Sequence, residues 1–155
     1  MNIVLEDYEM VQGANTGSLR HIASIKKGYK NKIKLESSWN THIEGACGEI
    51  AVSKAFGKYW GGSINTFKRG GDIDSTKWEV RTRSKHNYDL ILRNDDPQDR
   101  IYFLVTGLCP NYEIKGWIRG NDGMKQEYLH DHGNYGEAYF VPQEHLNNIK
   151  DLEVN

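Results

Sequence analysis

The sequence predicts an α/β or α+β domain with a mixed sheet and helices at both ends of the chain. Apolar residues follow a helical period before Gly57, and short β-branched or aromatic runs separated by Gly, Asn, Asp and Pro come after it. The 155 residues match one ordinary domain, because domains cluster at about 100–150 residues. We therefore predict a single unit over residues 1–155.

The first part of the chain, residues 1–39, is predicted to be a helical lead-in. Apolar side chains recur at spacings near three and four from Asp7 to Lys27, which indicates one amphipathic helix, or two helices broken around Gly13 or Gly17. The stretch KKGYKNKIKLESS that follows is basic and lacks apolar periodicity. We predict a charged loop there that is able to follow phosphate groups.

The clearest helix is predicted over residues 40–57. Thr41 and Glu44 fit a capping box at its start, and Gly57 fits the position just after its last residue. One apolar stripe of this helix consists of Ile43, Cys47 and Ile50. The stripe predicts which face of the helix is buried.

Small residues within this helix carry two further predictions. Gly45 and Gly48 each cost a helix roughly 1 kcal/mol relative to Ala, so they predict close packing against another element. Cys47 and Cys109 are too few for a four-thiolate zinc site or a disulfide framework, and both are expected to be reduced. Cys47 lies among apolar neighbours and is predicted to be a core residue, not a nucleophile.

A sheet is predicted over residues 63–141, and a helix over residues 142–152 follows it. The predicted strands are SINTF, KWEVRTR, YDLILR, IYFLVTG, YEIKGWI and AYFVP. Pro142 suits a first helical turn, and an apolar face would come from Leu146, Ile149 and Leu152. No run reaches the ~20 apolar residues that cross a bilayer, and the acidic start lacks a signal peptide's basic flank, so we expect a cytoplasmic protein.

The formal net charge of -1 conceals an uneven distribution. Residues 1–10 carry -3, residues 11–93 carry +8 and residues 94–155 carry -6. A basic block of this kind is typical of a face that binds a polyanion, although a solvated surface explains many charge runs. A total near zero therefore does not exclude a nucleic-acid partner.

Residues suited to metal chemistry concentrate in GGDIDSTKWEVRTRSK. A strand over KWEVRTR would alternate its side chains and place four charges on one face: Lys77, Glu79, Arg81 and Arg83. An edge strand with a solvated face explains the same alternation. Asp72 and Asp74 lie just upstream, however, and a turn at Gly71 would bring their carboxylates to the strand, giving an oxygen site suited to Mg²⁺ or Mn²⁺.

This succession of residues resembles the PD-(D/E)XK nuclease superfamily, which includes restriction endonucleases and phage and recombination nucleases. Glu49 in GACGEIAV matches the Glu of the family's helix, Asp72 in GGDID matches its metal-binding Asp, and Glu79 with Arg81 in EVR matches its (D/E)XK tripeptide. The resemblance covers residues 40–107, and the small size looks like that of compact phage-encoded members. Such a protein would act in the host cytoplasm.

The resemblance implies a restriction-endonuclease-like fold, a mixed central sheet flanked by helices, and a Mg²⁺- or Mn²⁺-dependent DNA endonuclease. It implies that Asp72, Glu79 and the backbone carbonyl of Val80 hold the cation, and that Glu49 binds a metal water or a second cation. Arg81 would stabilise charge on phosphorus but cannot accept a proton, which leaves water activation to the metal.

Departures from the family pattern leave alternatives open. Gly71 stands where the family has Pro, and Arg81 stands where it has Lys. Lys77 is an alternate residue for supplying the ammonium group of that Lys. Asp74 is an alternate for Asp72, because strand register decides which carboxylate faces Glu79. Arg81 also fits a second interpretation, a nucleic-acid-binding or structural protein that keeps the fold without turnover.

The expected partner is duplex or branched DNA, held through its phosphates without sequence reading. The side chains expected to bind it are Lys26, Lys27, Lys30, Lys32, Lys34, Lys68, Arg69 and Arg83. The acidic last third should stay off the DNA, and no membrane partner is expected. A homodimer would suit cleavage of both strands, but the sequence contains no heptad or other dimer signature.

Two further groups of residues have a structural and a functional interpretation. Tyr59, Trp60 and Phe67 lie near basic residues and could stack on bases, but core packing is the favoured prediction. His130 and His132 have a spacing that suits a transition metal, but a polar loop is the favoured prediction because no further ligand stands nearby.

Overall fold

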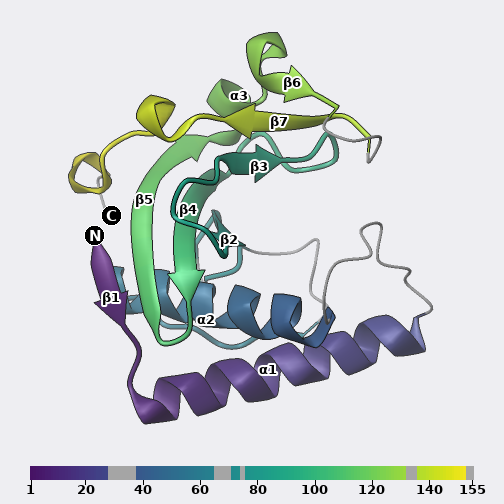
Figure 1. Ribbon diagram of the computed structural model, residues 1–155, viewed down its shortest axis with the longest axis vertical. Coiled ribbons are helices and arrows are strands. Elements are labelled where there is room, and N and C mark those ends of the chain that lie inside the picture. Colours follow the sequence, from purple (N-terminus) through teal and green to yellow (C-terminus); the bar gives the residue numbers. More distant parts are fainter. Residues whose placement is uncertain (28–37, 65–70, 74–75, 132–135, 153–155) are drawn as a thin grey trace.

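The computed structural model has three layers: a pair of helices, a four-stranded sheet and a three-stranded sheet (Figure 1). The predicted α+β class is therefore confirmed. The structure describes residues 1–27, 38–64, 71–73, 76–131 and 136–152. Among the helices it describes, none is long and apolar enough to cross a membrane.

The helical layer consists of α1 (Asp7–Lys26) and α2 (Ser38–Phe56). Of the two alternatives that the sequence left open, one continuous helix is confirmed and a break is not, because α1 runs without interruption through Gly13 and Gly17. A Cβ atom at Gly17 would lie 2.5 Å from the Ile43 Cα, and one at Gly13 would collide with the Cys47 Sγ. These glycines therefore allow α1 to pack closely on α2.

The start of α2 differs from the prediction, while its end agrees. The helix begins three residues before Thr41, so Thr41 and Glu44 form no capping box. The Glu44 carboxylate instead accepts hydrogen bonds from the Tyr112 hydroxyl at 2.5 Å and the Cys109 N–H at 3.1 Å. Gly57 has a φ of 61°, the left-handed conformation that ends many helices, and its predicted capping role is confirmed.

Sheet A is the mixed, four-stranded sheet, with the strand order β1-β5-β4-β2. Its strands are β1 (Asn2–Val4), β2 (Trp78–Arg83), β4 (Ile101–Leu108) and β5 (Asn111–Arg119). β2 runs parallel to β4, and the other neighbouring strands are antiparallel. The sequence patterns did not predict β1, which pairs with the far edge of β5.

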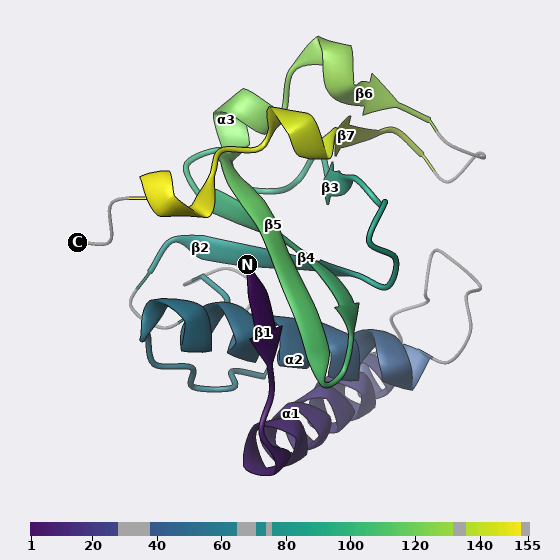
Figure 2. The same cartoon turned by 60° about the vertical axis from the view of Figure 1, so that its left-hand side comes forward.

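Sheet B is antiparallel and corrects the prediction of one sheet flanked by helices. Its strands are β3 (Leu90–Leu92), β6 (Leu129–His130) and β7 (Ala138–Val141), in the order β3-β7-β6. α2 packs against one face of sheet A, and α1 packs against α2 (Figure 2). The other face packs against sheet B through a core cluster that includes Leu90, Tyr102 and Val141. The short helix α3 (Gly120–Gly123) follows β5.

The predicted helix over residues 142–152 is wrong. The chain instead forms two short 3-10 turns, Gln143–His145 and Ile149–Asp151. Between them, Asn147 pairs with Trp117 through two backbone hydrogen bonds of 2.8 and 3.2 Å. Pairing with β5 holds this part of the backbone extended, which is incompatible with a helix. Of the predicted strand SINTF, Ser63 and Ile64 are not in a strand, and the rest lies outside the described residues.

Candidate active site

β2 separates an apolar face from a charged face, as its alternation predicted. Trp78 and Val80 belong to the core cluster that includes α2. Thr82 faces the same helix, because a Cβ atom at Gly48 would collide with its Oγ1. Glu79 points to the opposite face, where its ion pair with Arg81 lies.

Asp72 lies along the open edge of β2. Its N–H donates to the Trp78 carbonyl at 2.7 Å, and its Oδ2 accepts from the Val80 N–H at 2.8 Å. The N–H and carbonyl of a strand residue point to the same edge, so the Val80 carbonyl also faces this side. The Asp72 carboxylate and the Val80 carbonyl therefore share the unpaired edge of sheet A.

The structure explains why Gly precedes this Asp. The Gly71 N–H donates to the Thr76 carbonyl at 3.2 Å, a bond that Pro cannot make. A Cβ atom on Gly71 would also lie 2.5 Å from the Trp78 carbonyl oxygen. The tight turn that presents Asp72 thus requires glycine at this position.

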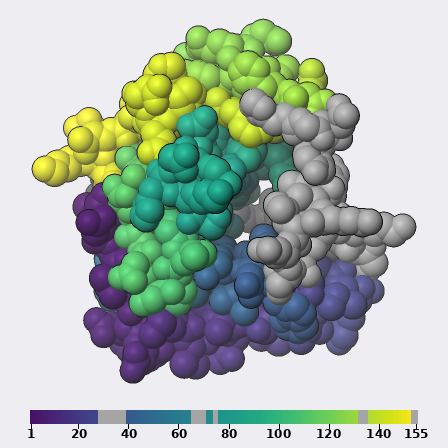
Figure 3. Space-filling view, viewed as in Figure 1, coloured from purple at the N-terminus to yellow at the C-terminus, as the bar shows by residue number. Residues whose placement is uncertain are grey.

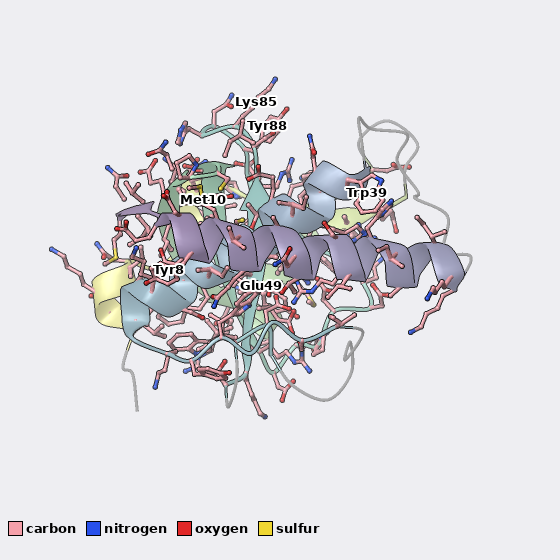
Figure 4. The ribbon with its side chains drawn as sticks, turned by 90° about the horizontal axis from the view of Figure 1, so that it is seen from below. Tyr8, Met10, Trp39, Glu49, Lys85 and Tyr88 are labelled. Atoms are coloured by element: carbon pink, nitrogen blue, oxygen red, sulfur yellow. The ribbon has the colours of Figure 1, made fainter. Side chains whose placement is uncertain are left out.

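Glu49 of α2 is buried in a network of three donors. Arg20 of α1 binds both carboxylate oxygens, at 2.6 and 2.9 Å, and the Trp60 Nε1–H donates to one of them at 2.8 Å. Burial raises the pKa of Glu49 to about 7, and the charge of Asp72 raises it too, whereas Arg20 and Trp60 lower it. Figure 4 shows Glu49 beside the middle of α1.

Glu79 is the second buried carboxylate, and two guanidinium groups bind it. Arg100 pairs with its Oε1 and Arg81 with its Oε2, the latter at 3.4 Å. Burial raises the pKa of Glu79, and the charge of Asp72 adds to this effect, against the opposing charges of Arg81 and Arg100. Arg81 also pairs with Asp96 at 2.9 Å, which ties the network to the loop before β4.

Asp72 links these two networks electrostatically. Its charge raises the pKa of Glu49 and of Glu79, and it also acts on Arg81. Of the four residues that the sequence marked as catalytic, Glu79 and Arg81 thus form an ion pair on one face of β2, and Asp72 lies at the edge of that strand. Glu49 belongs to α2, which packs against the other face of β2.

Sequence reasoning missed the partners that neutralise this cluster: Arg20, Asp96 and Arg100. One signal was present for Arg20, which lies on the α1 face that carries Gly13 and Gly17 and so packs inward. A charged residue on a packed face requires a partner. Arg100 and Asp96 belong to an irregular polar stretch before β4 and carry no comparable sequence signal.

Asp72, Glu79 and the Val80 carbonyl are oxygen donors, the type of ligand that hard cations prefer. Among residues that the structure describes, no group of three or more His, Cys, Asp or Glu side chains is arranged to hold a metal ion. Mg²⁺, however, is commonly held by one or two carboxylates, with water and substrate phosphate completing its shell. Asp72, Glu79 and the Val80 carbonyl are donors of this kind, and Arg81 and Arg100 would compete with the cation for Glu79.

The remaining predicted residues differ in how the structure places them. Lys77 is exposed and pairs with Asp99 at 2.7 Å. Lys26 is exposed at the end of α1 and Lys27 directly follows it, while Arg83 lies over the Tyr88 ring at 4.6 Å. The other predicted residues lie outside the described part of the chain: Lys30, Lys32, Lys34, Lys68, Arg69 and Asp74.

The structure tests some of the predictions for Cys47, for the aromatic residues near basic side chains and for the histidine pair. Cys47 is fully buried, and burial raises the pKa of its thiol to about 12, so its predicted core role is confirmed. Trp60 packs against the core, as predicted, but Tyr59 is 76% exposed and its predicted core role is wrong. Phe67 and His132 lie outside the described residues.

Comparison with known proteins adds no relative. No protein-family model matches this sequence, and a search of curated proteins found no match.

Proposed function

We propose that this protein is a metal-dependent endonuclease that hydrolyses phosphodiester bonds in DNA, with a restriction-endonuclease-like core. The observation that carries the proposal is the position of Asp72, which lies on the open edge of β2 beside Val80. Its charge raises the pKa of both Glu49 and Glu79. Convergent carboxylates with perturbed pKa values are typical of sites that perform acid–base or metal-assisted chemistry.

Each residue has a role in this proposal. Asp72, Glu79 and the Val80 carbonyl would hold Mg²⁺ or Mn²⁺, which lowers the pKa of a water molecule and neutralises phosphate oxygens. Arg81 would donate hydrogen bonds to the phosphate as its charge increases. Glu49 would bind a water molecule of the cation or a second cation, which requires Arg20 to release one of its carboxylate oxygens.

DNA is the proposed substrate because the basic block contains every proposed site residue. Lys26, Lys27 and Arg83 would contact phosphates, so binding should weaken steeply as salt increases. The acidic segment from residue 94 onward would stay off the DNA, apart from Asp96 and Arg100, which pair with Arg81 and Glu79 in the site. A cytoplasmic location and a homodimer that cuts both strands complete the proposal.

One observation favours a second candidate, a nucleic-acid-binding protein without turnover. Both oxygens of Glu79 are paired with arginines, and both oxygens of Glu49 accept bonds from Arg20. Guanidinium groups thus supply the positive charge that a cation would otherwise bring. A protein of this kind would bind DNA equally well with and without Mg²⁺.

Cleavage and cation binding distinguish the two candidates. We expect the wild type to nick or linearise supercoiled plasmid with Mg²⁺ or Mn²⁺. Asp72→Asn and Glu79→Gln should each cleave about 100-fold more slowly, which corresponds to an activation barrier that is higher by about 3 kcal/mol. Asp99→Asn is the matched control, because its carboxylate is exposed and pairs only with Lys77 among the described residues. Equal cleavage by all four proteins contradicts the assignment.

Thermal unfolding measures cation binding without turnover. Mn²⁺ should raise the Tm of the wild type and of Asp99→Asn but not that of Asp72→Asn, because a ligand that binds only the folded state stabilises it. DNA binding without cleavage and without a Mn²⁺ effect on Tm would support the second candidate.

A further inference from the structure

The outward face of α1 carries no charged side chain between the two ends of the helix. Five large apolar side chains on it are between 39% and 64% exposed: Tyr8, Val11, Leu19, Ile22 and Ile25. Gln12 and Asn15 are the other exposed positions between Tyr8 and Ile25, so this face contains no charge over 18 residues. Exposed helix faces normally carry charged residues, whereas interface cores are depleted of them.

The charges of α1 are either at its ends or turned inward. Arg20 pairs with Glu49 and Glu9 pairs with Lys54, and both pairs lie on the sides of the helix that face the rest of the protein. Asp7 and Lys26 are the first and last residues of α1, and both are exposed. The uncharged face is therefore a distinct surface, bounded by one acid and one base.

No other described element covers this surface. α1 forms the lowest layer of the molecule in Figure 1 and its lower rim in Figure 3, and it crosses the front of the view from below in Figure 4. Its packed side contacts α2 through Gly13 and Gly17. The helix is 20 residues, about 30 Å, long, and no described helix or strand lies over its opposite side, although the segment from Lys58 to Gly62 lines a cavity with Tyr8, Gln12 and Asn15 at one flank.

Much of this face is related by the midpoint of the helix. Four pairs of positions whose numbers add to 33 are complementary: Asp7 with Lys26, Tyr8 with Ile25, Val11 with Ile22, and Asn15 with Ser18. Gln12 and Leu19 also lie on the face, but their counterparts, His21 and Ala14, are buried and half-buried. Acid matches base, apolar matches apolar and small polar matches small polar. A two-fold interface requires this property, because residue i of one copy contacts residue j of the other and the reverse.

We infer that α1 of a second copy packs antiparallel on this face, about a two-fold axis at the midpoint of the helix. Tyr8 would contact the partner's Ile25, and Val11 would contact the partner's Ile22. Asn15 would lie beside the partner's Ser18. Asp7 would pair with the partner's Lys26, which in the dimer would then not contact DNA phosphate. Antiparallel helix dipoles and the two end ion pairs favour this orientation over the parallel one.

The area of the face sets the expected strength of the dimer. A strip about 30 Å long and about 10 Å wide is smaller than the roughly 800 Å² that each partner contributes to a standard interface. The dimer should therefore dissociate on dilution. A membrane surface fits less well, since helices that lie on membranes carry Lys and Arg along their polar flanks, whereas this face carries one base and one acid at opposite ends.

Sedimentation equilibrium of the full chain tests the interface. The wild type should approach twice the monomer mass of 17.8 kDa as concentration increases. Ile22→Glu should raise the dimer dissociation constant about 100-fold, because it places two unpaired charges in the interface. Leu108→Glu is the matched control, since Leu108 is 55% exposed on β4 and should leave the dimer unchanged. Circular dichroism establishes that both variants are folded.

A charge swap tests the antiparallel register. Asp7→Lys and Lys26→Asp should each weaken the dimer about three- to tenfold, because symmetry places each altered pair in the interface twice, and the double variant should recover the wild-type constant. Val11→Cys with Ile22→Cys should form an intermolecular disulfide that neither single variant forms. A monomeric mass at every concentration, a dimer that Ile22→Glu leaves intact, or binding of the monomer to anionic vesicles through this face would overturn the inference. None of these readouts depends on cleavage.

Discussion

Glu49 in the helical layer and Glu79 in sheet A are similar carboxylates with different surroundings. Both are buried, both have a pKa raised by burial, and both are affected by the charge of Asp72. Glu49 depends on one guanidinium from a separate helix and one indole N–H. Glu79 has two guanidiniums, both from sheet A or its border. The two carboxylates are similarly buried and therefore differ mainly in the number of arginines that neutralise them, one for Glu49 and two for Glu79.

The largest expected effect comes from removing those compensating charges. Arg20→Met should lower the free energy of unfolding by about 3–5 kcal/mol at neutral pH, because it leaves the Glu49 carboxylate buried without a cation. Arg100→Met should cost only about 1–3 kcal/mol, because Arg81 still pairs with Glu79. Urea unfolding of both variants measures the difference. Equal losses of unfolding free energy in the two variants would show that Arg81 does not compensate the Glu79 charge when Arg100 is removed.

The pH dependence of stability is the second test of the comparison. The pKa of Glu49 is about 7 in the folded protein against 4.5 without perturbation, so the folded state favours the protonated carboxyl. The contribution of Glu49 to the free energy of unfolding is therefore complete below pH 4.5 and is lost as pH rises through 7. A displacement of about two to three pKa units corresponds to about 3 kcal/mol. We expect the free energy of unfolding to fall over this pH range in the wild type.

Glu49→Gln should remove most of that fall, because the amide keeps the shape of the protonated carboxyl and does not titrate. Glu79→Gln should remove less, since two arginines oppose the rise of the Glu79 pKa. Chemical denaturation at several pH values between 4.5 and 8 measures each contribution. A larger effect of Glu79→Gln would reverse the ranking of the two sites.

The smallest expected effects concern the contact that joins the two regions. A Cβ atom at Gly48 would collide with Thr82 on β2, so Gly48→Ala should cost about 1–3 kcal/mol by forcing α2 and β2 apart. Gly45 has no atom within 4 Å of an added Cβ, so Gly45→Ala should stabilise by up to about 1 kcal/mol. The Tm of each variant distinguishes them, and adding Thr82→Ala to Gly48→Ala should recover part of the loss. A stable Gly48→Ala single variant would contradict the close contact.

Local patterns predicted the parts of the fold that depend on neighbouring residues. The alternation of β2, the end of α2 at Gly57 and the strands over residues 101–119 follow from periodicity and turn chemistry within short stretches. The predictions failed or left alternatives open where a distant segment decides the conformation. Pairing of Asn147 with Trp117 replaces the expected last helix, and packing against α2 keeps α1 continuous through its glycines.

The chemical character of the candidate site follows from the residues alone: a helix Glu, an Asp after glycine, and a strand that alternates charged and apolar residues. The charges that neutralise them become known only from the fold, because Arg20 and Arg100 approach from elements that are remote in sequence. The fold also decided that sheet B, and not a helix, covers the second face of sheet A. Burial and ion pairing depend on distance in space, which periodicity along one chain does not encode.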